Sequence, residues 1–416
     1  MSILMGFVGI ITLLAIAVAL SDNRKAINIR TVSGAFAIQA AFAAFVLYVP
    51  VGKDVLQAVS GGVQSVIDAS NAGISFLFGG LVSGKMFEVF GGGGFIFALK
   101  VLPVIVFFSS LIAVLYYLGI MQWIINIIGG ALQKALGTSR PESMSATANI
   151  FVGQTEAPLV VRPFIGKMTQ SELFAIMVGG LASVAGSVLA GYASLGVELK
   201  YLIAASFMAA PGGLLMAKII KPETEKANDS LEQVSDESED QPANVIDAAA
   251  AGASSGLHLA LNVGAMLLAF IGLIALLNGM IGGIGGWFGM PELSLQMILG
   301  YVFMPLAFLI GVPWEEAFTA GSFIGQKLVV NEFVAYIDFV GKAGELSAQT
   351  QAIITFALCG FANFSSIAIL LGGLGGMAPN RRHDIARMGI KAVIAGSLSN
   401  LMSATLAGLF IALAAL

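Results

Sequence analysis

A short polar stretch lies within an otherwise apolar part of the chain, from Asn149 to Pro158 (NIFVGQTEAP). It carries two amides, a hydroxyl and a carboxylate, and Gly153 and Pro158 flank its polar core. Because Pro lacks a backbone donor and Gly accepts unusual dihedrals, we expect a helix to break here. A broken helix at membrane depth is tolerated only within protein or beside a water-filled cavity. A carboxylate at that depth costs roughly 3 kcal/mol, so we interpret the stretch as a binding site rather than a cytoplasmic loop.

A second polar stretch, Gln326 to Ala335 (QKLVVNEFVA), contains Asn331-Glu332, which parallels Thr155-Glu156. The next apolar segment contains the polar run Phe361 to Ser366 (FANFSS). Carboxylates accept hydrogen bonds, whereas amides and hydroxyls both donate and accept. This set suits a neutral solute rich in hydroxyl and amide groups, and without a cluster of Arg or Lys an anionic solute is disfavoured.

A cation fits better than an anion. Asn149, the exposed carbonyls around Val152, and Ser183 could supply hard oxygen ligands, although Ser183 taken alone is explained better by helix packing. An enzyme is not expected, because the two His are distant in sequence and no HExxH, GxSxG or Walker pattern occurs. Transport would then use an ion gradient. A channel or sensor is the alternative.

The composition predicts an all-α polytopic membrane protein. Of the 416 residues, 57% are hydrophobic and 11% are charged, against about a quarter charged in soluble proteins. The single Cys359 excludes a disulfide within the chain, and the net charge of −4 gives no reason to expect a nucleic-acid partner.

The apolar segments and the positive-inside rule give a topology. Basic clusters at Arg24-Lys25 and Asn380 to Arg387 are placed in the cytoplasm, so the N-terminus lies outside. Val51 to Gly94 is predicted to be external, and Ile124 to Leu136 is predicted to be an interfacial helix. The segments predicted to span are Leu4–Leu20, Ser33–Val51, Phe95–Gly119, Leu173–Leu195, Tyr201–Ile220, Leu259–Met280, Ile353–Leu371 and a last C-terminal span.

Two segments are predicted to be re-entrant hairpins. Pro141 to Lys167 has arms of about a dozen residues, which reach only the midplane. Basic residues at both ends of the segment predict that the hairpin starts and finishes in the cytoplasm. Leu295 to Gly311 is predicted to be the first arm of a second hairpin, which enters from outside. The order of polar hairpin, polar span and apolar span occurs twice, in Pro141–Ile220 and Leu295–Leu416. This predicts inverted repeats with a substrate site between the two hairpin tips.

Several long stretches resemble bacterial concentrative nucleoside transporters. They are FGGLVSGKMFEVFGGGGF at Phe78–Phe95, NIFVGQTEAPLVVRP at Asn149–Pro163, NEFVAY at Asn331–Tyr336, CGFANFSSIAILLGG at Cys359–Gly373, and Arg387–Asn400. The resemblance implies a homotrimer with about eight transmembrane helices plus two re-entrant hairpins. It also implies sodium-coupled symport of nucleosides such as uridine, cytidine and adenosine across the inner membrane, by an elevator movement. Proton coupling within the same family is the alternative.

The resemblance also assigns residues and units. Gln154, Thr155 and Glu156 would contact the base, with Val188 and Phe361 packed against it, while Glu332, Asn363 and Ser366 would hold ribose hydroxyls. Asn149, Val152, Ser183 and Val184 would bind Na+, the two Val through carbonyls. A scaffold would comprise 1–137 and 248–293, and a mobile transport domain 138–222 and 294–416. An acidic cytoplasmic linker would occupy 223–247.

Overall fold

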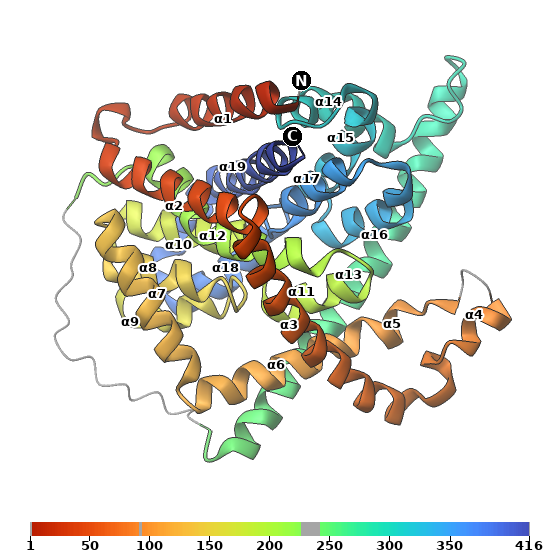
Figure 1. Cartoon of the computed structure of the whole chain (residues 1–416), viewed down its shortest axis with the longest axis horizontal. Coiled ribbons are helices and arrows are strands. Elements are labelled where there is room, and N and C mark those ends of the chain that lie inside the picture. Colours follow the sequence, from red (N-terminus) through yellow and green to blue (C-terminus); the bar gives the residue numbers. More distant parts are fainter. Residues whose placement is uncertain (1, 91–93, 226–241, 416) are drawn as a thin grey trace.

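The computed structural model describes residues 2–90, 94–225 and 242–415, and every regular element in these ranges is a helix (Figure 1). Seven of these helices are long and apolar enough to cross a membrane, or up to eight if one bent pair counts as a span. The all-α polytopic fold class is therefore confirmed.

The first third of the described chain contains seven helices. The seventh helix, Ile120–Leu136, lies between two glycines with positive φ, Gly119 (75°) and Gly137 (67°). It is therefore a separate helix from the span before it, as predicted for Ile124–Leu136. The segment predicted to be external is mostly one 29-residue helix, which by length and hydropathy also qualifies as a span. The helices are α1 (Ser2–Ala19), α2 (Ile29–Leu47), α3 (Pro50–Phe78), α4 (Lys85–Phe90), α5 (Phe97–Lys100), α6 (Leu102–Tyr117) and α7 (Ile120–Leu136).

The middle and last parts of the chain supply the core. The segments Gln170–Ser194 and Leu199–Ile220 are almost entirely buried, unlike the other candidate spans. The helices are α8 (Arg140–Ala148), α9 (Arg162–Ile165), α10 (Gln170–Ala182), α11 (Gly186–Ser194), α12 (Leu199–Ile220), α13 (Val245–Gly286), α14 (Leu295–Leu309), α15 (Trp314–Val329), α16 (Glu332–Lys342), α17 (Ala348–Leu358), α18 (Ser366–Met377) and α19 (Arg382–Ala414).

Helices α6 and α13 pack against each other over much of their length. The contact depends on glycine, because a Cβ at Gly252 would lie 2.5 Å from Ala113 Cβ and one at Gly256 would lie 2.7 Å from Ser109 Cβ. Small residues of this kind let membrane helices approach closely. At 42 residues, α13 is about 63 Å long, twice the thickness of a bilayer core.

Helices α1 and α2 belong with the core rather than with that pair. Both pack against α12 and α19. Gln39 of α2 is fully buried and donates to Ser403 Oγ of α19 at 2.9 Å. Helix α2 also packs against α3 and α7, so the predicted scaffold of residues 1–137 and 248–293 stays a prediction.

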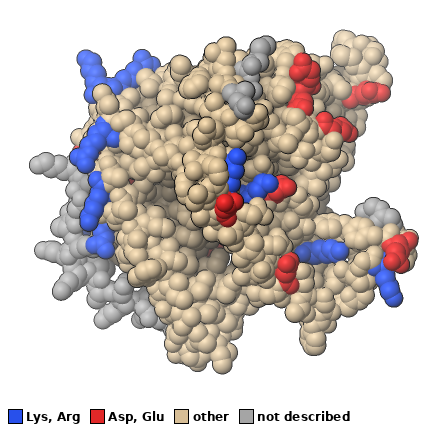
Figure 2. Space-filling view, in the orientation of Figure 1, with Lys and Arg blue, Asp and Glu red and all other residues tan. Residues whose placement is uncertain are grey.

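The charged side chains are unevenly distributed. On the face shown in Figure 2, many of the Lys and Arg side chains lie along one edge, where Figure 1 places α8, α9 and the turn between α1 and α2, and others lie near the centre and at the lower right. Most of the visible Asp and Glu lie toward the opposite edge. This asymmetry agrees with the predicted cytoplasmic side.

Only the ends of the predicted acidic linker, 223–247, fall within the described residues, since residues 226–241 lie outside them. At its start, Glu223 accepts a hydrogen bond from Thr169 Oγ1 at 2.8 Å. At its end, Asn244 caps α13 by accepting from the backbone N–H groups of Ile246 and Asp247.

Candidate functional site

The first hairpin begins with a strong helix start and ends early. Ser139 and Glu142 form a capping box at the N-terminus of α8, and Ser139 N donates to Glu142 Oε2 at 2.9 Å. Helix α8 then stops at Ala148, after nine residues or about 14 Å. The return arm starts as the 3-10 helix Ala157–Val161 and continues as α9. The break predicted at Asn149–Pro158 is confirmed.

The irregular tip between the two arms leaves buried acceptors without donors. Asn149 Nδ2 donates to Ser145 O at 2.9 Å, but Asn149 Oδ1 is buried with no partner among the described atoms. Gln154 Oε1 is likewise buried with no partner among the described atoms. Glu156 is exposed, and its Oε2 accepts from Gly153 N at 2.6 Å. Because buried polar atoms are normally paired, the two free oxygens indicate where a ligand or water would bind.

The tip packs on a second break, which the sequence did not reveal. The span predicted as continuous, Leu173–Leu195, is interrupted between α10 and α11 at residues 183–185. Gly186 N donates to Phe151 O at 2.9 Å, and a Cβ at Gly186 would lie only 2.8 Å from that oxygen. Gly180 likewise faces Gln154, whose Cβ would be 2.8 Å from an added Cβ.

This contact brings together the residues predicted to bind a cation. Asn149, Val152, Ser183 and Val184 are all buried. Ser183 Oγ donates to Gly179 O at 2.9 Å, so its lone pairs are free to accept or to coordinate. Among the described residues, no hydrogen bond reaches the carbonyl oxygens of Val152 or Val184. The set offers neutral, hard oxygen atoms, which suits a monovalent cation.

The second hairpin is built by α15 and α16, which reverse at Val330-Asn331. Asn331 caps α16 by accepting from Val334 N at 2.9 Å. The arms contact each other through the Phe323 and Phe339 rings, 5.7 Å apart. Glu332 is therefore the first residue of α16, and it is buried at the hairpin tip.

The segment predicted as the first arm of this hairpin, Leu295–Gly311, is instead α14, a helix that lies beside the arm α15. α14 and α15 meet at a break of 118°, where Gly311 has a φ of 105°, so the predicted interruption near Pro313 is present. However, the helix that leads into Asn331 and Glu332 is α15. α14 packs along α15, since a Cβ at Gly321 would lie 2.6 Å from Met304 N.

The second hairpin tip contacts another broken span, predicted as continuous over Ile353–Leu371. α17 ends at Leu358 and α18 begins at Ser366. Within the break, Asn363 Nδ2 donates to Glu332 Oε2 at 2.9 Å, while Asn363 Oδ1 accepts from Ser366 N at 3.0 Å and from Ser366 Oγ at 3.1 Å. The three predicted ribose-binding side chains thus form one buried network.

Tyr192 also belongs to this network, although it was not among the residues predicted from the sequence. Its hydroxyl donates to Glu332 Oε1 at 3.2 Å from the fully buried face of α11. Tyr192 follows Val188 by four residues, so both side chains lie on one face of the same helix. This spacing of four residues from Val188 was the sequence feature that could have identified Tyr192.

A backbone hydrogen bond joins the two halves, because Phe361 N in the second break donates to Ser183 O in the first break at 3.2 Å. Within the second half, Phe364 N donates to Leu328 O near the end of α15, also at 3.2 Å. A Cβ at Gly373 of α18 would lie 2.9 Å from Thr155 Cγ2, so the first tip also touches the second half. The predicted residues therefore gather around two hairpin tips and two broken spans.

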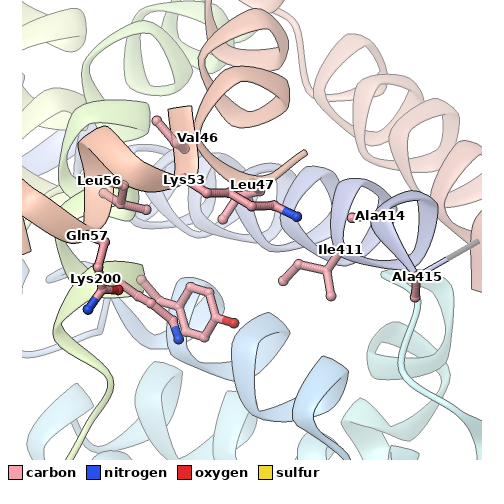
Figure 3. Close-up of a pocket in the computed structure, with 10 residues that line it drawn as sticks. Val46, Leu47, Lys53, Leu56, Gln57, Lys200, Ile411, Ala414 and Ala415 are labelled. Atoms are coloured by element: carbon pink, nitrogen blue, oxygen red, sulfur yellow. The ribbon is translucent and has the colours of Figure 1, made fainter. Parts of the chain in front are cut away.

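The cavities elsewhere in the molecule hold none of these residues. One of about 360 Å³ is lined by parts of α2, α3, α12 and α19, with Lys53 and Lys200 among mainly apolar side chains (Figure 3). Another, of about 400 Å³, lies between α13 and the second hairpin, beside Gln326 and Asp338. We place the candidate site at the tips, because the buried, unpartnered Asn149 Oδ1 and Gln154 Oε1 and the buried carboxylate of Glu332 lie there.

Three family models together match most of the chain. A model described as Na+ dependent nucleoside transporter C-terminus matches residues 201–408. Its N-terminal counterpart matches residues 8–81, and a model described as Nucleoside recognition matches residues 98–198.

Whole-chain relatives agree with these models. The chain is 65% identical to an Uncharacterized transporter of Haemophilus influenzae, covering 100% of this chain and 99% of the relative. It is 55% identical to the Nucleoside permease NupC of Helicobacter pylori, covering 99% of both.

A solved structure of a relative, CNTnw in an inward-facing substrate-bound state, is 65% identical over 99% of both chains, with a TM-score of 0.96. An outward-facing double variant of CNTnw gives a TM-score of 0.98 over 99% of both chains.

Proposed function

The chain belongs to the concentrative nucleoside transporter family and is a multi-pass protein of the inner membrane. We propose that it couples nucleoside uptake to sodium entry. This family consists of transporters and not of enzymes. The chemistry of the site then consists of binding and release, and the energy comes from the gradient of the coupled ion.

The observation that carries the proposal is the buried network at the second tip. Glu332 is held by Tyr192 and Asn363, so its carboxylate has a fixed position inside a mostly apolar protein. A ribose offers adjacent hydroxyl donors, and a carboxylate is a strong acceptor for them. Asn363 and Ser366 add further polar atoms, so in this proposal the second tip binds the sugar.

The first tip would bind the base. Gln154 keeps an unpartnered oxygen, Thr155 lies against α18, and Glu156 is exposed, so these side chains can meet the amino and imino groups of a nucleobase. Val188 is buried and Phe361 is half-buried beside the two breaks, where they would pack on the base plane. Uridine, cytidine and adenosine all present a flat ring with an amino or imino group on its edge.

Sodium would occupy the set of oxygens at the first break. Asn149 Oδ1 and the carbonyls of Val152 and Val184 accept no hydrogen bond from the described residues, and Ser183 directly precedes Val184 in the same break. One positive charge that crosses 100 mV releases about 2.3 kcal/mol, which supports roughly 50-fold accumulation of a neutral solute.

Alternating access would follow from the packing. Inward-facing and outward-facing structures exist for CNTnw, whose fold this chain shares. In the proposed elevator movement, residues 138–222 and 294–416, which hold both hairpins and both broken spans, move past a scaffold of residues 1–137 and 248–293 that includes the pair α6–α13. A homotrimer would hold that pair in place through its outer surface.

Uptake into proteoliposomes tests the proposal. Purified protein is reconstituted, and uptake of labelled uridine is measured with an inward sodium gradient, with an inward proton gradient, and with choline in place of sodium. We expect concentrative, saturable uptake only with the sodium gradient, and competition by cytidine or adenosine.

Two results would overturn it. Equal uptake in choline with a proton gradient would show proton coupling instead. Flux that does not saturate and equilibrates without any gradient would show a channel.

A further inference from the structure

Lys327 is a buried cation for which the site described above gives no role. It lies in α15, five residues before Glu332, and its side chain is buried. Its Nζ donates to Asn400 Oδ1 at 2.6 Å and to Ala357 O at 3.0 Å. A buried ammonium is very unfavourable without partners, so these two acceptors account for its presence there. Ala357 lies in the last turn of α17, whose free carbonyls and dipole favour a cation.

Asn400 of α19 extends the contact to the other half of the molecule. Its Nδ2 donates to Ala182 O at 2.6 Å and to Cys359 O at 3.0 Å. Ala182 is the last residue of α10, and Cys359 is the first residue after α17. One side-chain amide therefore satisfies a carbonyl at each of the two helix breaks.

The glycine at position 360 makes room for this amide. A Cβ at Gly360 would lie 2.3 Å from Asn400 Oδ1 and 2.6 Å from Asn400 Nδ2. Gly360 thus allows the second break to close directly onto Asn400. All the hydrogen-bonding atoms of the pair are engaged with named partners in four different elements: α15, α17, α10 and α19.

The position of these contacts links the two halves of the site. Ser183, in the proposed sodium set, directly follows Ala182, while Phe361 and Asn363 follow Cys359 by two and four residues. Phe361 N also donates to Ser183 O. A shift of one break on ligand binding would therefore be passed to the other through Asn400, and to the second hairpin through Lys327.

We propose that Lys327 and Asn400 are a positioning pair that transmits sodium binding at the first break to nucleoside binding at the second. Neither residue touches either ligand in this scheme. The inference rests on the proposed function, and it adds the residues through which the two ligands bind cooperatively. Coupling between two sites is commonly 5- to 150-fold in affinity, and it is reciprocal.

The test measures cooperativity rather than activity. Uridine affinity of purified protein is measured by calorimetry in sodium chloride and in choline chloride, and the ratio of the two dissociation constants is the coupling factor. Wild type is expected to give a factor of at least about 10. Lys327→Met and Asn400→Ala are expected to reduce the factor at least about fivefold, with less than about threefold change of affinity in choline.

Two further variants separate positioning from general stability. Lys327→Arg keeps a cation with several donors and is expected to retain most of the coupling factor. Ser403 lies on α19, one turn from Asn400, and accepts a buried hydrogen bond from Gln39 of α2. Ser403→Ala removes that hydrogen bond without touching either break. It is expected to leave the factor unchanged. An unchanged factor in Lys327→Met and Asn400→Ala, or an equal loss in Ser403→Ala, would overturn the proposal.

A measurement on wild type covers the case in which the variants do not fold. Hydrogen–deuterium exchange is followed with sodium added and no nucleoside. We expect protection in peptides that contain residues 357–366, although the proposed cation set lies at residues 149–184. Protection confined to the first hairpin and first break would overturn the pair's role. If sodium has no effect on wild-type uridine affinity, sodium coupling itself is wrong.

Discussion

At the scale of single residues, the two hairpin carboxylates differ in environment. Glu332 is buried and accepts hydrogen bonds from two side chains that come from other elements. Glu156 is exposed and accepts from the backbone of its own loop. We therefore expect Glu332 to hold one part of the nucleoside in a fixed orientation, whereas Glu156 can adapt to different bases.

Glu332→Gln should weaken nucleoside binding while leaving the fold intact. The amide has nearly the same shape, but it replaces a charged acceptor by a neutral one. Hydrogen bonds to a charged group contribute about 1.5–3 kcal/mol, so uridine affinity should fall roughly 10- to 150-fold. Calorimetric titration measures this, with Tyr192→Phe as a milder comparison that removes one donor to Glu332. A Glu332→Gln protein that binds uridine like wild type would contradict the assignment of the sugar to this tip.

Asn149→Leu should raise the sodium concentration needed for half-maximal uptake, because it removes the unpartnered Oδ1. Losing one neutral oxygen ligand without replacement should cost about 1–3 kcal/mol, or a 5- to 150-fold shift. Ser145→Ala is the matched control, since Ser145 Oγ is also buried and unpartnered but lies outside the proposed set. Sodium titration of uptake distinguishes them. An equal shift in both variants would show that the effect comes from packing.

The sequence identified the polar residues of both tips but not those that support them. Asn149, Gln154 and Glu332 stand out because polar side chains are conspicuous in apolar surroundings. Tyr192 and Asn400 do not, because their partners lie 140 and up to 218 residues away in the chain. Such pairings depend on the fold, which no local pattern contains.

At the scale of elements, both broken spans were predicted as continuous. Averaged hydropathy hides a break of a few small or polar residues, such as 183–185, inside a long apolar segment. The hairpin at Asn149–Pro158 was easier to recognise, because Pro158 and several polar residues coincide there. The arm that leads into Glu332 was misplaced for a related reason. Pro313 is a strong break signal, but the reversal at Val330-Asn331 contains neither Pro nor Gly.

Gly186→Ala should separate the first hairpin from the first break. The added Cβ would meet Phe151 O at 2.8 Å, and a backbone oxygen cannot move away as a side chain can. Overpacking of this kind costs about 1–3 kcal/mol, so sodium-dependent uptake should fall about 5- to 150-fold. Gly191→Ala on the same helix is the control, since its Cβ would reach Val101 Cγ1 only at 3.4 Å. Comparable activity of the two variants would argue against close packing at this break.

At the scale of the whole molecule, a contact on the basic edge ties the turn after α1 to the core. Asp22 pairs with Lys221 at 3.0 Å and with Lys391, so α1, α12 and α19 meet at one carboxylate. Burial by itself would raise the pKa of Asp22, but the hydrogen bonds from Lys391 and Lys221 outweigh it and lower that pKa.

Asp22→Asn should therefore cause a small loss of stability that does not depend on pH between 5 and 8. A lowered pKa means that the stabilisation is complete above the ordinary value of 3.8 and is lost only as the pH falls through the lower folded value. Since the carboxylate is 37% exposed, solvent screening keeps the effect below about 1 kcal/mol. Melting curves at several pH values measure it, with exposed Asp54→Asn as the control. A difference that disappears between pH 8 and 5 would contradict this sign.

The arrangement of the whole chain was predictable to a limited extent. The repeated order of hairpin and spans indicated two related halves, and the structure shows each half as a hairpin tip on a broken span. The apolar pattern of α1 and α2 did not predict which helices they contact, since their surfaces match any buried helix. Their contacts with α12 and α19 became visible only in three dimensions.

The most direct test of the account is an experimental density map of the protein with uridine and sodium bound. The account predicts nucleoside density between the two tips, with the ribose within hydrogen-bonding distance of Glu332 and Asn363 and the base beside Gln154 and Glu156. Density in the cavity lined by Lys53 and Lys200, with both tips empty, would contradict it.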